Sequence, residues 1–204
     1  MRASFALSAI ALSYAALVAA QDQTIQVGGG SNTAGGVFQF IPPTFNATEG
    51  SVITFNFTGI PGAHSISQSN FTDPCQPLPG GFDSGFVLIS APADPFPTWN
   101  LTITNASQPI WFFCKQLAPQ PHCKAGMVGG INVPASGNHS FTTFQAAARS
   151  SSGNPGQAEG GLVGIGASAS APPSPLTGSV QGSANPTGAS APTQSGAAAS
   201  TTGR

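Results

Sequence analysis

The chain has 204 residues, of which only five are Lys or Arg and six are Asp or Glu. This scarcity of charge excludes a basic surface of the kind that binds nucleic acid or anionic lipid. Solubility must therefore come from uncharged polar residues and from any attached sugars.

The N-terminus has the pattern of a secretory signal peptide. Arg2 precedes an apolar run over residues 5–18, and small residues follow up to Gln21. A charged region, an apolar region and a small-residue cleavage site predict a signal peptide over residues 1–20, cut after Ala20. The alternative is a membrane anchor, which is disfavoured because the run is short and ends in small residues. We therefore expect a secreted, extracellular protein with no membrane span.

Glycosylation sequons support the secretory route. Six Asn-x-Ser/Thr sequons lie in the part of the chain before residue 145, and each is an acceptor only in a protein that enters the secretory pathway. Their asparagines are Asn46, Asn56, Asn70, Asn100, Asn105 and Asn138. The sequence therefore predicts a eukaryotic secreted glycoprotein.

Residues 21–145 are predicted to form one all-β domain. Apolar residues alternate with polar ones in short runs that Gly, Pro and Asn interrupt, which is typical of a β-sandwich. The predicted strands cover residues 24–28, 37–41, 51–58, 98–104, 109–114 and 127–133. No long helical pattern is present, although a single helical turn fits residues 67–73.

Residues 146–204 form the predicted tail. They are rich in Ser, Ala, Gly and Pro and contain no aromatic residue. A segment of this composition cannot bury enough apolar surface to offset its ordering entropy, so we expect a disordered stalk that carries O-linked sugars. A plain flexible tail remains the alternative. The last residues lack the hydrophobic run of a GPI signal, so GPI anchoring is not expected.

Four side chains suggest a metal site. Cys114, His122 and Met127 lie close together in the sequence, and His64 follows a Gly-Ala pair upstream. Two imidazoles, one thiolate and a weak axial thioether form the ligand set of a type 1 (blue) copper site. Each residue alone is weak evidence, and a single His in a β-domain is more often structural. The ordered set predicts one copper ion, with zinc as the alternative metal.

The predicted mature chain has an odd number of cysteines, Cys75, Cys114 and Cys123. An unpaired thiol in an oxidising compartment needs a reason to persist, and metal ligation supplies one. His122 and Cys123 are adjacent and point in opposite directions in an extended chain. This geometry favours a Cys75–Cys123 disulfide with Cys114 on the metal. The alternative pairs Cys114 with Cys123 and would abolish the copper site.

The domain resembles the cupredoxins, specifically the plastocyanin-like and phytocyanin-like secreted group with its fungal extracellular members. The resemblance covers residues 23–134 and includes the segment Phe40–Phe55 and the block His122-Cys-Lys-Ala-Gly-Met127. It implies a Greek-key β-sandwich of about seven or eight strands. It also implies that the copper ligands are His64, Cys114, His122 and Met127, with a disulfide between Cys75 and Cys123. The seven residues between Cys114 and His122 form a longer loop than plant phytocyanins have.

These features predict a secreted copper protein that carries single electrons and is not an enzyme, because its four protein ligands leave no position for a substrate. The alternatives are a structural glycoprotein of the cell wall or matrix, associated with wall polysaccharide, and a protein that sequesters copper. We expect a monomer whose redox partner the sequence does not identify. Leu117 and the prolines near His122 are candidates for a small contact surface. The loop aspartates Asp73, Asp83 and Asp94 are expected to form turns.

Overall fold

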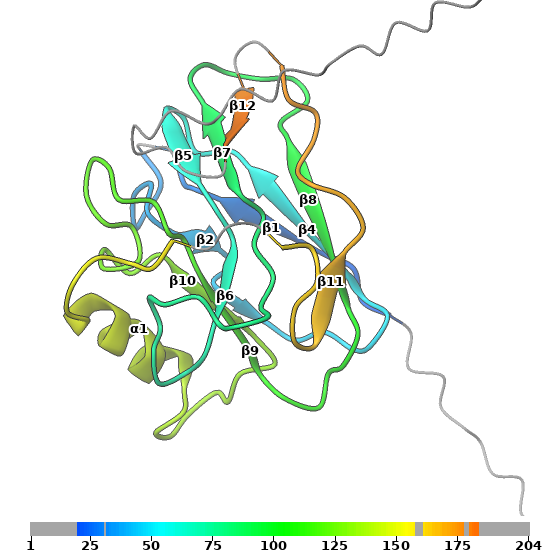
Figure 1. Ribbon diagram of the computed structural model, residues 1–204, viewed down its shortest axis with the longest axis vertical. Coiled ribbons are helices and arrows are strands. Elements are labelled where there is room, and N and C mark those ends of the chain that lie inside the picture. Colours follow the sequence, from blue (N-terminus) through cyan, green and yellow to red (C-terminus); the bar gives the residue numbers. More distant parts are fainter. Residues whose placement is uncertain (1–19, 31, 158–160, 178–179, 184–204) are drawn as a thin grey trace, which may run out of the picture.

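The computed structural model describes residues 20–30, 32–157, 161–177 and 180–183. Its strands form a five-stranded sheet in the order β11-β8-β4-β1-β2, a four-stranded sheet β3-β10-β9-β6 and a three-stranded sheet β12-β7-β5 (Figure 1). The elements are β1 (Gln23–Val27), β2 (Phe40–Ile41), β3 (Thr44–Phe45), β4 (Val52–Phe57), β5 (Gly62–His64), β6 (Ser67–Ser69), β7 (Phe86–Ile89), β8 (Thr98–Ile103), β9 (Ile110–Phe113), β10 (Val128–Ile131), α1 (Phe141–Ser150), β11 (Ala167–Ala169) and β12 (Val180–Ser183). The predicted all-β fold class is confirmed.

The alternation of apolar and polar residues along the strands determines which side chains form the core. In β4 the side chains of Ile53, Phe55 and Phe57 are buried, and in β8 Trp99 is buried while Asn100 is exposed. Successive residues of a strand point to opposite faces of the sheet, so one face of each strand packs inward. All three sheets contribute to the main buried cluster. The predicted inner and outer faces of these two strands are therefore correct.

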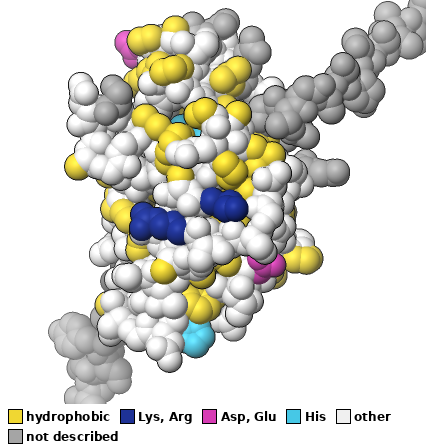
Figure 2. Space-filling view, turned by 90° about the vertical axis from the view of Figure 1, so that its left-hand side faces the viewer, with side chains coloured by type: hydrophobic (Ala, Val, Ile, Leu, Met, Phe, Trp, Pro, Cys, Tyr) yellow, Lys and Arg dark blue, Asp and Glu magenta, His cyan; other side chains and the backbone are white. Residues whose placement is uncertain are grey.

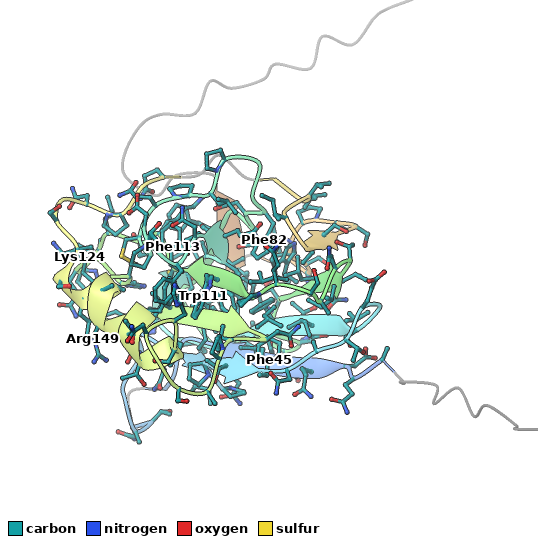
Figure 3. All side chains as sticks on the ribbon, turned by 90° about the horizontal axis from the view of Figure 1, so that it is seen from below. Phe45, Phe82, Trp111, Phe113, Lys124 and Arg149 are labelled. Carbon is teal, nitrogen blue, oxygen red and sulfur yellow. A yellow bond between two sulfur atoms is a disulfide. The ribbon has the colours of Figure 1, made fainter. Side chains whose placement is uncertain are left out.

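Strand β9 is buried on both faces, and a helix explains why. Ile110 and Phe112 belong to the main core, whereas Trp111 and Phe113 belong to a second cluster with Phe144 of α1. The rings of Trp111 and Phe144 have their centroids 4.4 Å apart, and α1 covers this outer face of the four-stranded sheet (Figure 3).

Helix α1 was not predicted from the sequence. Ser140 caps it by accepting a hydrogen bond from the Thr143 amide, and Phe144 and Ala148 are its buried residues. Residues four apart lie on the same helix face, so this pair forms a narrow apolar stripe. The helix has only ten residues, and Phe144 is the one large side chain on its buried face. The remaining residues are mostly Ser, Thr and Ala, so the sequence gives little helical periodicity.

The packed structure extends past the predicted boundary at residue 145. Strand β11 pairs with β8, and β12 pairs with β7, so the C-terminal segment lies on edges of two sheets. Ala167 and Ala169 join the main core. The tail composition predicted disorder because such a segment cannot build a core of its own. Here it adds backbone hydrogen bonds and small side chains to a core that already exists.

Other expectations also differ from the structure. Twelve strands are present in the described residues, more than the seven or eight expected, because several contain only two to four residues. The predicted helical turn at 67–73 is wrong at its start, where β6 pairs with β9. The signal peptide, apart from Ala20, and residues 184–204 of the tail lie outside the described residues. Within the described part of the chain, no helix is long and apolar enough to cross a membrane.

Candidate metal centre

His64 is the last residue of β5, and the backbone of three glycines surrounds its imidazole ring. A Cβ atom added to Gly28, Gly59 or Gly62 would lie 2.6, 2.7 or 2.9 Å from Nε2 of the His64 imidazole. Side chains at these positions would therefore displace the ring. The small residues around His64, which the sequence suggested would permit a tight turn, also leave room for the imidazole.

Backbone hydrogen bonds bring the other three predicted ligands together. Cys114 directly follows β9, and its amide donates to the Met127 carbonyl at 3.1 Å. The Met127 amide donates to the His122 carbonyl at 2.9 Å, and the His122 amide donates to the Gln116 carbonyl at 2.9 Å. The long loop between Cys114 and His122 therefore folds back on itself, so that its two ends lie side by side.

One sulfur and two imidazole nitrogens form a compact buried group. The Cys114 sulfur lies 3.5 Å from Nδ1 of His122 and 3.9 Å from Nδ1 of His64. One ligand atom from each residue lies within 4.8 Å of the others. His64 and His122 are each 2% exposed, and Cys114 is 0% exposed. The fold thus collects three of the four predicted ligands around one point.

Burial keeps all three groups uncharged in the metal-free protein. It lowers the pKa of His64 to about 3, with the charge of His122 as a smaller cause. It also lowers the pKa of His122 to about 4, against an opposing effect of the Ala118 backbone. Burial raises the pKa of the Cys114 thiol to about 11, although hydrogen bonds from the Gln116 and Ser65 backbones favour the thiolate. Neutral imidazoles have free nitrogen lone pairs, so both can bind a metal without first losing a proton.

This donor set fits a soft, nitrogen- and sulfur-binding metal such as copper. Met127, the predicted axial ligand, is 0% exposed and belongs to the same buried cluster as Cys114. The Cys114 sulfur accepts a hydrogen bond from the Ser65 amide at 3.4 Å, a contact that orients a ligand thiolate. Phe38 covers His122, with ring centroids 4.4 Å apart. The Nε2 atom of His122 is buried without a hydrogen-bond partner among the described residues.

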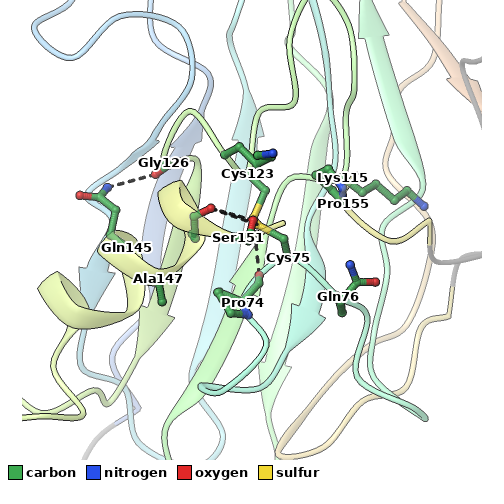
Figure 4. Close-up of a disulfide and its surroundings, with 12 residues drawn as sticks. Pro74, Cys75, Gln76, Lys115, Cys123, Gly126, Gln145, Ala147, Ser151 and Pro155 are labelled. Atoms are coloured by element: carbon green, nitrogen blue, oxygen red, sulfur yellow. Dashed lines mark hydrogen bonds between the residues drawn. A yellow bond between two sulfur atoms is a disulfide. The ribbon is translucent and has the colours of Figure 1, made fainter. Parts of the chain in front are cut away.

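The disulfide joins Cys75 to Cys123, as the resemblance implied, and Cys114 is a free thiol (Figure 4). The Cys75 sulfur also accepts a hydrogen bond from the Ser151 hydroxyl at 3.4 Å. The disulfide therefore links Cys123, the residue next to His122, to the segment before β7. The Ser151 hydrogen bond links the same disulfide to the end of α1. The alternative pairing of Cys114 with Cys123 is wrong.

Sequence reasoning missed a buried ion pair next to Cys114. The Lys115 ammonium lies 2.8 Å from a carboxylate oxygen of Asp83, and their side chains are 0% and 2% exposed. Asp83 was expected to form a turn, and its carboxylate does accept the Gly85 amide two residues on, but its burial in an ion pair was not expected. Its position among Gly and Ser gives no sign of burial, because the partner lies 32 residues away in sequence.

The six sequons differ in exposure. Asn46, Asn100, Asn105 and Asn138 are exposed, whereas Asn56 and Asn70 are half-buried. Asn56 lies in β4, between β1 and β8, and its side-chain oxygen is buried. Near the metal centre, Leu117 and Pro121 are half-buried and Pro119 is exposed.

No family model matches the chain. A curated relative from the fungus Arthroderma benhamiae, described as a probable GPI-anchored cupredoxin-1, is 33% identical over 165 residues. The match covers 80% of this chain and 78% of the relative. The chain therefore belongs to the cupredoxin family, as its fold and its His-Cys-His group indicated.

Solved structures with a similar fold include an auracyanin, a plastocyanin and a pseudoazurin. Auracyanin from Roseiflexus castenholzii is 17% identical, with a TM-score of 0.37 over 54% of this chain and 94% of its own. Plastocyanin from Dryopteris crassirhizoma is 20% identical, with a TM-score of 0.34 over 53% and 96%. A pseudoazurin from Sinorhizobium is 21% identical, with a TM-score of 0.34 over 65% and 98%. These likenesses are too distant to bear on the site.

Proposed function

We propose that this protein is a secreted copper protein with one type 1 copper ion, and that it carries single electrons. The observation that carries the proposal is the buried group of one thiol and two imidazole nitrogens, within 4.8 Å of one another. Copper bound there would supply a one-electron couple between Cu(II) and Cu(I). His64, Cys114 and His122 would bind it, and Met127 would be the weak axial ligand.

Copper suits the site better than zinc. A structural zinc site normally has four Cys or His ligands. Among the described residues only three such donors gather here, and the remaining cysteines form a disulfide. A buried thioether in the fourth position favours copper, since Met is a poor ligand for zinc and an ordinary one for type 1 copper.

The burial of the ligands favours a carrier over an enzyme. Catalytic metal sites keep an open position for water or substrate. Here His64, Cys114, His122 and Met127 are each 2% exposed or less. Electron transfer needs no open position, because the electron passes through the ligands. Pro119 and the half-buried Leu117 and Pro121 offer a small uncharged surface beside His122 for a one-electron partner. Figure 2 shows that the face of the molecule with α1 carries few charged side chains.

A role as a cell-wall or matrix glycoprotein is the second candidate, and the exposed sequons favour it. Asn105 follows β8, whose end pairs with the start of β4, whereas His64 follows the end of β4. Asn46 follows β3, which runs parallel to β10 and away from Met127. Sugars at both positions would lie at the end of the sandwich opposite the metal centre and leave it uncovered. The two roles are therefore compatible.

Visible absorption and EPR spectra of the purified chain with added Cu(II) test the proposal. We expect an intense blue band, narrow copper hyperfine splitting and one copper per chain. Cys114→Ser, His64→Ala and His122→Ala should each abolish the blue band. His139→Ala is the matched control, because His139 packs on Phe71 outside the metal centre. A colourless chain that binds no copper would refute the proposal. A blue chain whose Cu(II) resists mild reductants would instead indicate copper sequestration.

The extracellular location is part of the same proposal. It rests on the signal peptide predicted over residues 1–20 and on the exposed sequons, and the description of the fungal relative as a probable GPI-anchored protein supports it. N-terminal sequencing of the exported protein should give Gln21 as the first residue. Retention of the apolar N-terminus in the mature protein would contradict the predicted cleavage.

A further inference from the structure

A buried ion pair includes the residue that follows the candidate ligand Cys114. Lys115 follows the predicted ligand Cys114, and its ammonium group lies 2.8 Å from the Asp83 carboxylate, with both side chains at most 2% exposed. Removing two charges from water is costly, and only good geometry with further hydrogen bonds compensates for it. The whole chain contains only eleven charged residues, five basic and six acidic. The burial of two of them beside the metal centre indicates a role at that centre.

Both charges are fixed in place. One carboxylate oxygen of Asp83 accepts the Gly85 amide at 2.7 Å, and the other accepts a short hydrogen bond from the Ser67 hydroxyl. The Lys115 ammonium also lies 4.8 Å from the centre of the Phe86 ring, a favourable cation–π contact. The pair therefore acts as a rigid dipole.

Ser65 connects this dipole to the Cys114 sulfur. Its amide lies 3.4 Å and its hydroxyl 4.0 Å from the sulfur. The same hydroxyl accepts the Lys115 amide at 3.0 Å and lies 3.5 Å from the Ser67 hydroxyl, which in turn donates to Asp83. A continuous chain of polar contacts thus runs from the buried carboxylate to the sulfur.

The C-terminal segment forms hydrogen bonds with both members of the ion pair. The backbones of Asp83 and Gly161 exchange two hydrogen bonds, of 2.7 and 3.1 Å. The Gln157 side chain donates to the Lys115 carbonyl at 2.8 Å. Residues beyond the predicted domain boundary therefore help to fix both members of the pair.

We propose that the Asp83–Lys115 pair is a positioning element that holds Ser65 against the Cys114 sulfur, fixes a positive charge on the residue next to Cys114 and so sets the reduction potential of the bound copper. This inference rests on the proposed function. Hydrogen bonds to the cysteine sulfur are a recognised lever on the potential of such sites. Reduction adds one electron and lowers the positive charge of the site, so a nearby positive charge favours the reduced form.

The two ends of the dipole predict shifts of opposite sign. Lys115→Met removes the positive end and leaves the carboxylate, so the potential should fall. Asp83→Asn removes the negative charge and keeps the ammonium group, so the potential should rise. We expect each change to alter the ratio of reduced to oxidised protein about tenfold, which is about 59 mV for one electron. Lys124→Met is the matched control, because its ammonium donates to the Gly153 carbonyl at an exposed site. Its shift should be less than half as large.

The test is a redox titration of the full chain at an electrode, which supplies the electron, with the blue band as the signal. Opposite shifts in the two variants support the proposal. Shifts of the same sign, or shifts no larger than that of Lys124→Met, overturn it. If either variant does not fold, Ser67→Ala breaks the link from Asp83 to Ser65 and leaves the ion pair in place. It should lower the potential, and an unchanged potential would count against the proposal.

Amide hydrogen exchange in the metal-free chain separates this inference from the proposed function. The Ser65 amide donates to the Cys114 sulfur, and the Lys115 amide donates to the Ser65 hydroxyl. Both should exchange at least tenfold faster in Ser67→Ala, whereas the amides of β8 should not change. A wild-type chain that binds no copper refutes the proposed function only. Unchanged exchange at Ser65 in Ser67→Ala refutes the positioning role.

Discussion

The glycine pocket around His64 allows a sharp prediction for Gly28→Ala. Gly28 has a φ of +80°, and a Cβ there would lie 2.6 Å from the His64 imidazole and 2.7 Å from the Gly59 backbone. Two penalties therefore combine. An L-residue in left-handed backbone costs roughly 1–2 kcal/mol, and forcing an extra methyl group into a packed site costs roughly 1–3 kcal/mol.

Gly50→Ala is the control that separates the two penalties. Gly50 has a φ of +86°, but a Cβ there would meet nothing within 4 Å. It should lose only the backbone part, about 1–2 kcal/mol. The difference between the two variants measures the clash with His64, and we expect it to be about 1–3 kcal/mol.

Urea unfolding of the metal-free chain measures the two free energies, and titration with Cu(II) adds a second readout. The Gly28→Ala methyl group should push the imidazole away from the Cys114 sulfur and weaken copper binding, whereas Gly50→Ala should bind copper normally. Equal losses of stability in the two variants would refute the close approach of Gly28 to His64. Unchanged copper affinity in Gly28→Ala would show that the imidazole is not a ligand.

Three further predictions follow from the disulfide and the titrating groups. Replacing Cys75 and Cys123 with Ser should cost about 4 kcal/mol, since the bond closes a loop with a sequence separation of 48; an unchanged urea midpoint would contradict this. His64 and His122 have folded pKa values of about 3 and about 4, below the unfolded value near 6.5. Only the unfolded chain takes up protons as the pH falls below 6.5, so metal-free stability should drop by roughly 3 kcal/mol per pH unit near pH 5. Equal unfolding free energies at pH 7 and pH 5 would exclude buried neutral imidazoles. Because the pKa of Cys114 is raised to about 11, copper binding must displace one proton. Its affinity, measured against a chelator of known pH dependence, should rise about tenfold per pH unit near neutrality, and a flat profile would exclude the thiolate as ligand.

The amino-acid sequence by itself determined the strands that carry strong alternation, and it indicated the candidate ligands that the fold brings together. Ile53, Phe55 and Phe57 alternate with polar residues, so the inner face of β4 follows from a period of two. Cys114 and His122 are close in sequence and of unusual chemistry, so they are recognisable without knowledge of the fold. These are local signals, which a single stretch of sequence can carry.

Only the tertiary structure decided what surrounds the proposed copper ligands. The approach of Gly28 to His64, the pairing of Asp83 with Lys115 and the packing of Phe144 on Trp111 each join residues that are far apart in the chain. None of them has a local pattern. The C-terminal segment shows the same limit, because Ala167 and its neighbours have too little apolar surface to predict a strand. They form one only where the edge of β8 offers unpaired backbone groups.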